Sequence, residues 1–149
     1  MKSDELEARE CIRDTLARYN HAGDRGRLSE LAACFAPDGV LELSSEDLST
    51  GPAEIEARLS RVVSSSKARA TRPLVRHHVS SIEISMEGPD EAQARCYFLV
   101  FTEVGLDHWG RYADRFECRD GVWCLAHRRV RVSGATANSR MASEYAVEA

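Results

Sequence analysis

The sequence predicts an α+β domain in which helices come first and a strand meander follows. Two observations support this prediction. Apolar residues recur at helical spacing within the first 65 residues, whereas residues 76–132 show patterns typical of strands, separated by short turn signals. Strands that follow one another after short turns are expected to pair in antiparallel fashion.

Three helices are expected, over residues 4–20, 27–34 and 53–65. The apolar side of the first helix is formed by Leu6, Ile12, Leu16 and Tyr19. Pro52 precedes the third helix, and proline suits the first turn of a helix because its missing N–H has no helical partner there.

A short strand is expected at residues 40–43, followed by a polar loop at 44–51. Four further strands are predicted at residues 76–86, 91–103, 108–118 and 121–132. Asp120-Gly121, between the last two, is a strong hairpin signal because both residues tolerate the backbone of a tight turn.

The chain of 149 residues has the size of one domain with a single core, which we assign to residues 1–132. Residues 133–149 are small and polar, and they are expected to be loosely ordered or to lie at a subunit interface.

The net charge of −4, without a basic face, argues against nucleic acid as a partner. No segment approaches the roughly 20 apolar residues that span a bilayer, so no membrane association and a cytoplasmic location are expected.

The chemistry-bearing residues favour catalysis without a cofactor. Five cysteines without a CxxC spacing are expected to be free, buried thiols. Metal sites need three or four convergent ligands, and neither an HxH nor an HExxH spacing occurs. The sequence also has no glycine-rich phosphate loop and no GxSxG turn. Acid–base chemistry with no metal and no cofactor is what remains.

Asp24 and His77 are the candidate catalytic pair. Asp24 follows the first helix and His77 opens a strand, and a carboxylate that orients an imidazole gives a general base that works near neutral pH. His78 competes with His77, because neighbouring side chains on a strand point to opposite faces. Strict alternation groups His78 with Ile82 and Ile84, whereas a single bulge would reverse that grouping.

Several motifs occur in a familiar order: Tyr19-x4-Asp24, Phe35-x2-Asp38-Gly39, Gly51-Pro52-x2-Ile55, His77-x-Val79-Ser80, Gly110-Arg111-Tyr112-x-Asp114 and Arg119-Asp120-Gly121-Val122-Trp123. Together they resemble the SnoaL-like group of the NTF2-like superfamily, over roughly residues 5–132. The resemblance implies three N-terminal helices packed in the concave face of a curved, mostly antiparallel sheet, around a conical cavity.

The group includes scytalone dehydratase, bile-acid dehydratase, hexachlorocyclohexane dehydrochlorinase, polyketide cyclases and ketosteroid isomerase, as well as proteins that only bind ligands. In its dehydratase branches an Asp at the end of the first helix pairs with a His on the sheet, which implies catalytic roles for Asp24 and His77 and favours His77 over His78. The resemblance also implies that Tyr19 polarises the substrate. Ser81 stands where many members of the group have Asn.

The candidates for substrate binding are His78, Tyr97, Tyr112, Arg129 and Phe35. Tyr97 can equally face an interface. Arg128 competes with Arg129 for the cavity, because the two neighbours face opposite ways on a strand. His108 and His127 are expected at a strand or hairpin surface.

The expected function is proton removal from a small hydrophobic ring compound, polyketide- or steroid-like, by a dehydratase that uses the Asp–His pair. Isomerisation or cyclisation on the same scaffold is the alternative enzyme reading, and a non-catalytic module that binds a small ligand is the alternative outside catalysis. Apolar residues on both faces of the strand at 91–103 predict a homodimer or homotrimer.

Overall fold

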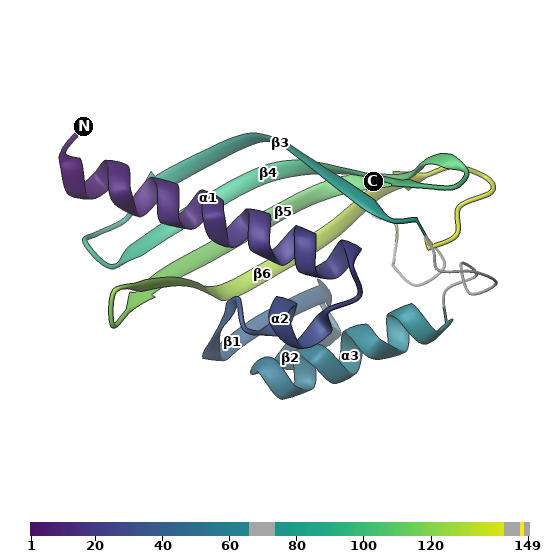
Figure 1. Ribbon diagram of the computed structural model, residues 1–149, viewed down its shortest axis with the longest axis horizontal. Helices are drawn as coiled ribbons and strands as arrows, with labels where there is room; N and C mark the ends of the chain where they lie inside the picture. The colour runs from purple at the N-terminus through teal and green to yellow at the C-terminus, as the bar shows by residue number, and fades with distance from the viewer. Residues whose placement is uncertain (66–73, 142–146, 148–149) are drawn as a thin grey trace.

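The computed structural model describes residues 1–65, 74–141 and 147 (Figure 1). Along the chain the elements are α1 (Ser3–Asp24), α2 (Leu28–Ala32), β1 (Phe35–Ser44), β2 (Asp47–Thr50), α3 (Pro52–Ser65), β3 (Arg76–Met86), β4 (Glu91–Thr102), β5 (Gly105–Arg119) and β6 (Val122–Ala135). The strands form one curved sheet in the order β2-β1-β6-β5-β4-β3, and α1 runs across it while α2 and α3 lie near β1 and β2. Only β1 and β6 pair in parallel among these strands, so the predicted α+β layout is confirmed.

The long helix α1 buries one side against the concave face of the sheet. Ile12, Leu16 and Tyr19 are buried on this side, and the Thr15 hydroxyl donates a hydrogen bond to the Trp123 carbonyl of β6 at 2.9 Å. The helix extends four residues beyond the predicted end at residue 20 and carries Asp24 as its last residue. Asp24 is therefore held by helical geometry and not by a flexible turn.

Two differences from the predicted strands concern β2 and the end of β6. Residues 44–51 contain β2, an edge strand that pairs with β1, whereas the sequence predicts only a loop there. Ser49 is the single buried residue of β2, so the segment has no alternating apolar pattern to reveal it. In addition, β6 continues to Ala135, into the segment predicted as a tail.

A bulge in β3 decides which histidine faces the helices. Ser80 pairs with Tyr97 but Glu83 pairs with Arg95, so β3 holds one extra residue between these pairs. The extra residue is Ser81, whose φ of 52° lies in the left-handed region. The extra residue reverses the alternation, so His77 lies on the same face as the apolar residues that follow the bulge, and His78 is exposed on the other face.

The segment after β6 is held by Asp107 at the start of β5. The Thr136 amide donates to the Asp107 carbonyl at 2.9 Å, and the Arg140 amide and Ser139 hydroxyl donate to its carboxylate at 2.7 and 2.5 Å. Residues 142–146 and 148–149 of the predicted tail lie outside the described residues.

Among the helices that are described, none combines the length and apolar character of a membrane span.

Candidate active site

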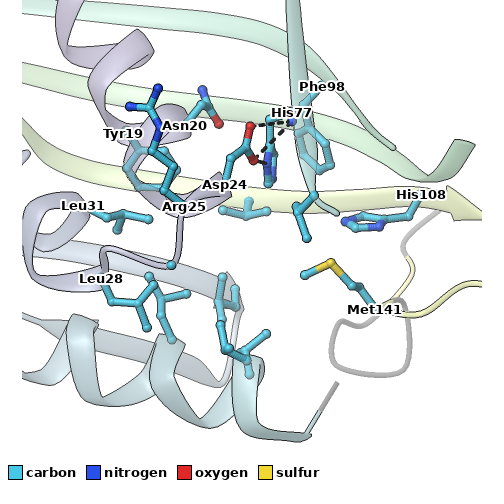
Figure 2. Close-up of a pocket in the computed structure, with 18 of the residues that line it drawn as sticks. Tyr19, Asn20, Asp24, Arg25, Leu28, Leu31, His77, Phe98, His108 and Met141 are labelled. Atoms are coloured by element: carbon cyan, nitrogen blue, oxygen red, sulfur yellow. Dashed lines mark hydrogen bonds and ion pairs between the residues drawn. The ribbon is translucent and has the colours of Figure 1, made fainter. Parts of the chain in front are cut away.

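A cavity of about 230 Å³ lies between the helices and the concave face of the sheet (Figure 2). Most of its wall is apolar and comes from all three helices and from the sheet. The apolar lining residues are Leu28, Leu31, Leu43, Leu59, Val62, Val63, Val75, Phe98, Val130, Val132 and Met141. Such a lining favours an apolar ligand, with a few polar groups left to fix its orientation.

Asp24 and His77 form a hydrogen-bonded pair in the cavity wall. The Asp24 Oδ1 atom lies 2.6 Å from His77 Nδ1, and Oδ2 accepts a second bond from the His77 backbone N–H at 3.1 Å. Both side chains are largely buried. A carboxylate can only accept at this distance, so Nδ1 carries the proton and Nε2 holds the lone pair of the neutral ring. The structure therefore brings the predicted pair into the geometry of a carboxylate-oriented base.

Tyr19 and Tyr112 belong to a buried stack around Arg128. The Arg128 guanidinium lies 4.1 Å from the centre of the Tyr19 ring and 4.0 Å from that of Tyr112, and it donates two hydrogen bonds to Asp114 at 2.9 and 2.7 Å. Burial alone would lower the pKa of Arg128, but the Asp114 carboxylate outweighs it and raises that pKa, so the guanidinium stays charged. Burial raises the pKa of Tyr19, which keeps its hydroxyl protonated. Both tyrosines line the cavity.

His108 lines the cavity as well, although the sequence predicts it at a surface. It is 3% exposed, and its Nδ1 atom lies 2.8 Å from the Asp107 carboxylate. Burial lowers the pKa of His108, so its ring is neutral near pH 7. Burial alone would raise the pKa of Asp107, but hydrogen bonds from the Arg140 amide, Ser139, His108 and Thr102 outweigh it and lower that pKa. The register of β5 against β4 shifts beside this residue, which strand alternation cannot foresee.

Three of the predicted substrate-binding residues lie on the outer face of the sheet. His78 is exposed and packs edge-on against Phe101, with ring centres 5.1 Å apart, and Tyr97 is 60% exposed. Arg129 donates to the Glu42 carboxylate at 3.0 Å on the same face. The sheet separates these side chains from the cavity, so the predictions that His78, Tyr97 and Arg129 contact a ligand there do not fit the structure.

Phe35 and Tyr112 have different positions relative to the cavity. Tyr112 is part of its wall. Phe35 is buried behind Tyr19, with ring centres 6.1 Å apart, and is not among the lining residues. Phe35 therefore supports the position of Tyr19 and does not contact a ligand directly.

The cysteines and the other potential metal ligands of the described residues do not form a cluster. No group of three or more His, Cys, Asp or Glu side chains converges on a common point within the described part of the chain. All five cysteines are free, and burial raises the pKa of Cys96 to about 12, which leaves its thiol protonated and weakly nucleophilic. The polar groups that line the cavity include the Asp24 carboxylate and the imidazole rings of His77 and His108.

A helix-covered curved sheet with a carboxylate–imidazole pair in an apolar cavity defines a class of small α+β domains that accommodate small molecules. The chain belongs to the family of SnoaL-like domains, whose profile matches residues 4–129. A comparison with curated protein sequences found no significant match.

Solved structures with the same fold include three informative relatives. A protein of Novosphingobium aromaticivorans provisionally assigned as a scytalone dehydratase has a TM-score of 0.79 and 23% identity, covering 100% of this chain and 95% of that one. LinA has a TM-score of 0.77 and 18% identity, covering 91% of this chain and 93% of that one. A protein of Catenulispora acidiphila in complex with S-DNPA has a TM-score of 0.69 and 26% identity, covering 81% and 90%.

Proposed function

We propose that this protein is a cofactor-free acid–base enzyme that acts on a small apolar ring compound. The observation that carries the proposal is the 2.6 Å contact between Asp24 and His77 in the wall of an apolar cavity. Because Asp24 holds the Nδ1 proton, the His77 Nε2 atom is the base. Membership of the SnoaL-like family supports this reading, since the family includes small-molecule enzymes.

Dehydration is the reaction that we favour. The His77 Nε2 atom takes a proton from a carbon next to a carbonyl, and Asp24 stabilises the imidazolium that forms. The electrons of the broken C–H bond form a C=C bond, and the neighbouring C–O bond breaks. The imidazolium returns its proton to the departing hydroxide, which leaves as water. A positioned base of this kind contributes about 10²–10⁴-fold to the rate.

Tyr19 is the proposed donor to the carbonyl oxygen, where negative charge develops. Its hydroxyl stays protonated because burial raises its pKa. The Arg128 guanidinium against the ring face favours any negative charge shared with the phenol. A single preorganised donor of this kind is worth about 10²–10³-fold in rate.

The size of the cavity narrows the class of substrate. Its volume of about 230 Å³ is below the range of about 300–1,000 Å³ that is common for ligand pockets. A compound of one or two fused rings fits this size better than a four-ring steroid. We therefore propose a polyketide-like ring as the substrate. The name of the Novosphingobium relative adds support for dehydration of such a compound.

Two other functions use the same cavity. In an isomerase or cyclase, His77 would return the proton to a carbon of the substrate, and no water would leave. In a module that only binds ligands, the pair would serve structure alone, and the relative solved with S-DNPA shows that this fold can hold a small molecule. The buried pair at the cavity wall favours the enzyme.

A matched set of variants tests the catalytic proposal. Turnover of bicyclic β-hydroxy ketones is followed by the absorbance of the conjugated product. We expect His77→Ala to lower kcat by about 10²–10⁴-fold. Asp24→Asn should lower it as well, because a neutral amide does not stabilise the positive charge of the imidazolium that forms on His77. His78→Ala is the control, since this neighbour is exposed on the outer face, and it should keep wild-type turnover. Full activity in His77→Ala would contradict the mechanism.

We also propose that the chain forms a homodimer or homotrimer through the outer face of the sheet. Tyr97 and Leu99 are 60% and 40% exposed on neighbouring outward positions of β4. Apolar groups gathered on one face favour association. Light scattering should give a mass of two or three chains, and Tyr97→Glu should shift it to one. A wild-type protein at monomer mass would overturn this proposal.

A further inference from the structure

A hollow on the outer face of the sheet collects arginines from three neighbouring strands. It is open to solvent and has a volume of about 310 Å³. At its centre lies Ala113 of β5, which pairs with Arg95 of β4 on one side and with Arg129 of β6 on the other. Two positions further along β5, Arg115 pairs with His127. Residues two apart on a strand share a face, so these side chains surround one space outside the sheet.

The geometry of the sheet leaves room for a ligand over Ala113. Neighbouring strands are about 4.8 Å apart, so the backbones of Arg95 and Arg129 lie about 10 Å apart across the alanine. The methyl group of Ala113 is short, and the space above it stays open. Arg95, Arg115 and Arg129 therefore border this open space from three strands.

Glu42 fixes one side of the hollow, whereas the other side has cations without a partner. The Glu42 carboxylate accepts hydrogen bonds from Arg129 at 3.0 Å and from His127 at 2.8 Å. Arg95 and Arg115 are exposed, and neither side chain forms a hydrogen bond or ion pair within the part of the chain that the structure describes. Like charges on neighbouring strand positions repel each other. An anion bound between them would remove this repulsion.

The carboxylates near the hollow do not cancel its charge. Asp114 contributes only backbone to the wall, because its side chain is fully buried on the other face of the sheet and paired with Arg128. Glu83 is opposite Arg95 in the strand register, but these two described side chains form no ion pair. Glu42 is 6% exposed and already accepts hydrogen bonds from its own partners. An anion in the hollow therefore meets guanidinium groups before it meets carboxylates.

We infer that this hollow binds the phosphoryl group of a small molecule, either inorganic phosphate or a phosphate ester. A phosphoryl group carries about −1.5 to −2 charges near pH 7 and three acceptor oxygens, which suits guanidinium groups that come from three strands. A carboxylate is planar and is satisfied by the fork of a single arginine. The net charge of −4 opposes a long polyanion such as nucleic acid. The hollow lies outside the cavity, so the inference does not rest on the proposed function.

NMR titration of the backbone amide signals tests the site with inorganic phosphate and methyl phosphate at constant ionic strength. Methyl phosphate has no apolar ring that would enter the cavity. We expect saturable shifts around Ala113 with a dissociation constant of about 1 mM, the affinity that three exposed charge-assisted hydrogen bonds provide. Tighter binding of methyl phosphate would support a phosphate ester as the ligand, and tighter binding of inorganic phosphate would support the free ion. Acetate, as a carboxylate, should bind about 5-fold more weakly or less.

Three variants locate the bound anion. Arg115→Gln should weaken the binding of methyl phosphate about 5- to 10-fold, because it removes one charge-assisted hydrogen bond. Ala113→Leu should also weaken it, because the larger side chain fills the hollow without changing the charge. Arg111→Gln is the matched control, since this arginine is exposed on the same strand but does not line the hollow, and it should keep the wild-type affinity.

The hollow lies beside the apolar pair that we propose for association. Arg95 is the outward residue of β4 that precedes Tyr97, so the site lies at the rim of that contact. Leu99→Ser removes an apolar side chain from the contact without changing the charge of the face. This variant is titrated beside the wild type, so that a hollow covered by a second copy is distinguished from one that binds no anion.

Absence of saturable binding of both phosphoryl probes to the wild type and to Leu99→Ser would overturn the inference. Binding of acetate as tight as that of methyl phosphate would overturn it as well, and so would wild-type affinity in Ala113→Leu. An equal loss of affinity in Arg111→Gln and Arg115→Gln would also count against it, because binding would then follow the charge of the whole face and not this hollow.

Discussion

Replacement of Arg128 by methionine should destabilise the protein strongly, because this buried side chain lies against the rings of Tyr19 and Tyr112 in the cavity wall. Arg128 and Asp114 have fully buried side chains joined by two hydrogen bonds. Arg128→Met keeps much of the side-chain volume but leaves the Asp114 carboxylate buried without its cation. The faces of Tyr19 and Tyr112 lose the same cation.

The size of the effect follows from the uncompensated charge. Removing one partner of a buried ion pair costs about 3–5 kcal/mol in the free energy of unfolding. For a domain of this length, 1 kcal/mol corresponds to about 2–4 °C, so the melting temperature should fall by about 6–20 °C. Asp114→Leu should have a comparable effect, because it leaves the guanidinium buried alone. The double variant should recover most of the loss, since replacing both charges by apolar groups is often neutral.

Urea unfolding followed by circular dichroism measures all three variants in a double-mutant cycle. Arg129→Met is the matched control, because this neighbour is half exposed and pairs with Glu42 on the outer face. It should change the stability by less than about 1 kcal/mol. An Arg128→Met protein as stable as the control, or a double variant that loses the sum of both single losses, would refute the reasoning.

Three further predictions concern Asp107, His108 and Ser81. Asp107→Asn should cost about 2–4 kcal/mol in urea unfolding, because an amide cannot accept from all the donors around this carboxylate; stability equal to the wild type would contradict that network. Burial lowers the pKa of His108 in the folded protein. As the pH falls, this histidine is therefore protonated in the unfolded chain before it is protonated in the folded one. Its contribution to stability is therefore complete above about pH 6.5 and declines as the pH falls below that value, and His108→Gln should flatten this decline in melting curves. At the φ of 52° of Ser81, Ser81→Val should cost about 1–2 kcal/mol and Ser81→Gly should be tolerated, and equal losses in both would argue against the bulge.

The elements that depend on local periodicity could be predicted from the sequence, and so could the pairing of Asp24 with His77. The choice of face could not be derived from alternation, because Ser81 adds a residue whose effect on parity depends on its backbone angle. The resemblance to the SnoaL-like group gives one indication of the bulge, because many members of that group have Asn at the position of Ser81. Asn adopts positive φ more readily than most residues, which is what such a bulge requires.

The buried charges show a second limit of sequence reasoning. The run from Arg128 to Arg131 has the alternation of a strand, but alternation alone does not say which arginine points inward. Arg128 is inside because Asp114 lies opposite it on β5 and the two tyrosines flank it, and these partners come from distant parts of the chain. The position of His108 is a similar case. Its ring contacts the Asp107 carboxylate, and that carboxylate accepts hydrogen bonds from Ser139 and Arg140 in the segment after β6.

The parallel pairing of β1 with β6 has a consequence for the order in which the cavity forms. Glu42 and Arg129 face each other across these strands although they are 87 positions apart in the chain. Contacts between such distant residues form slowly, because closing a long loop costs chain entropy first. We therefore expect β1, β2 and α3, which supply Leu43 and Leu59 to the cavity, to dock late in folding. A ligand that fills the cavity should then slow unfolding without accelerating folding, because its site is absent from the transition state.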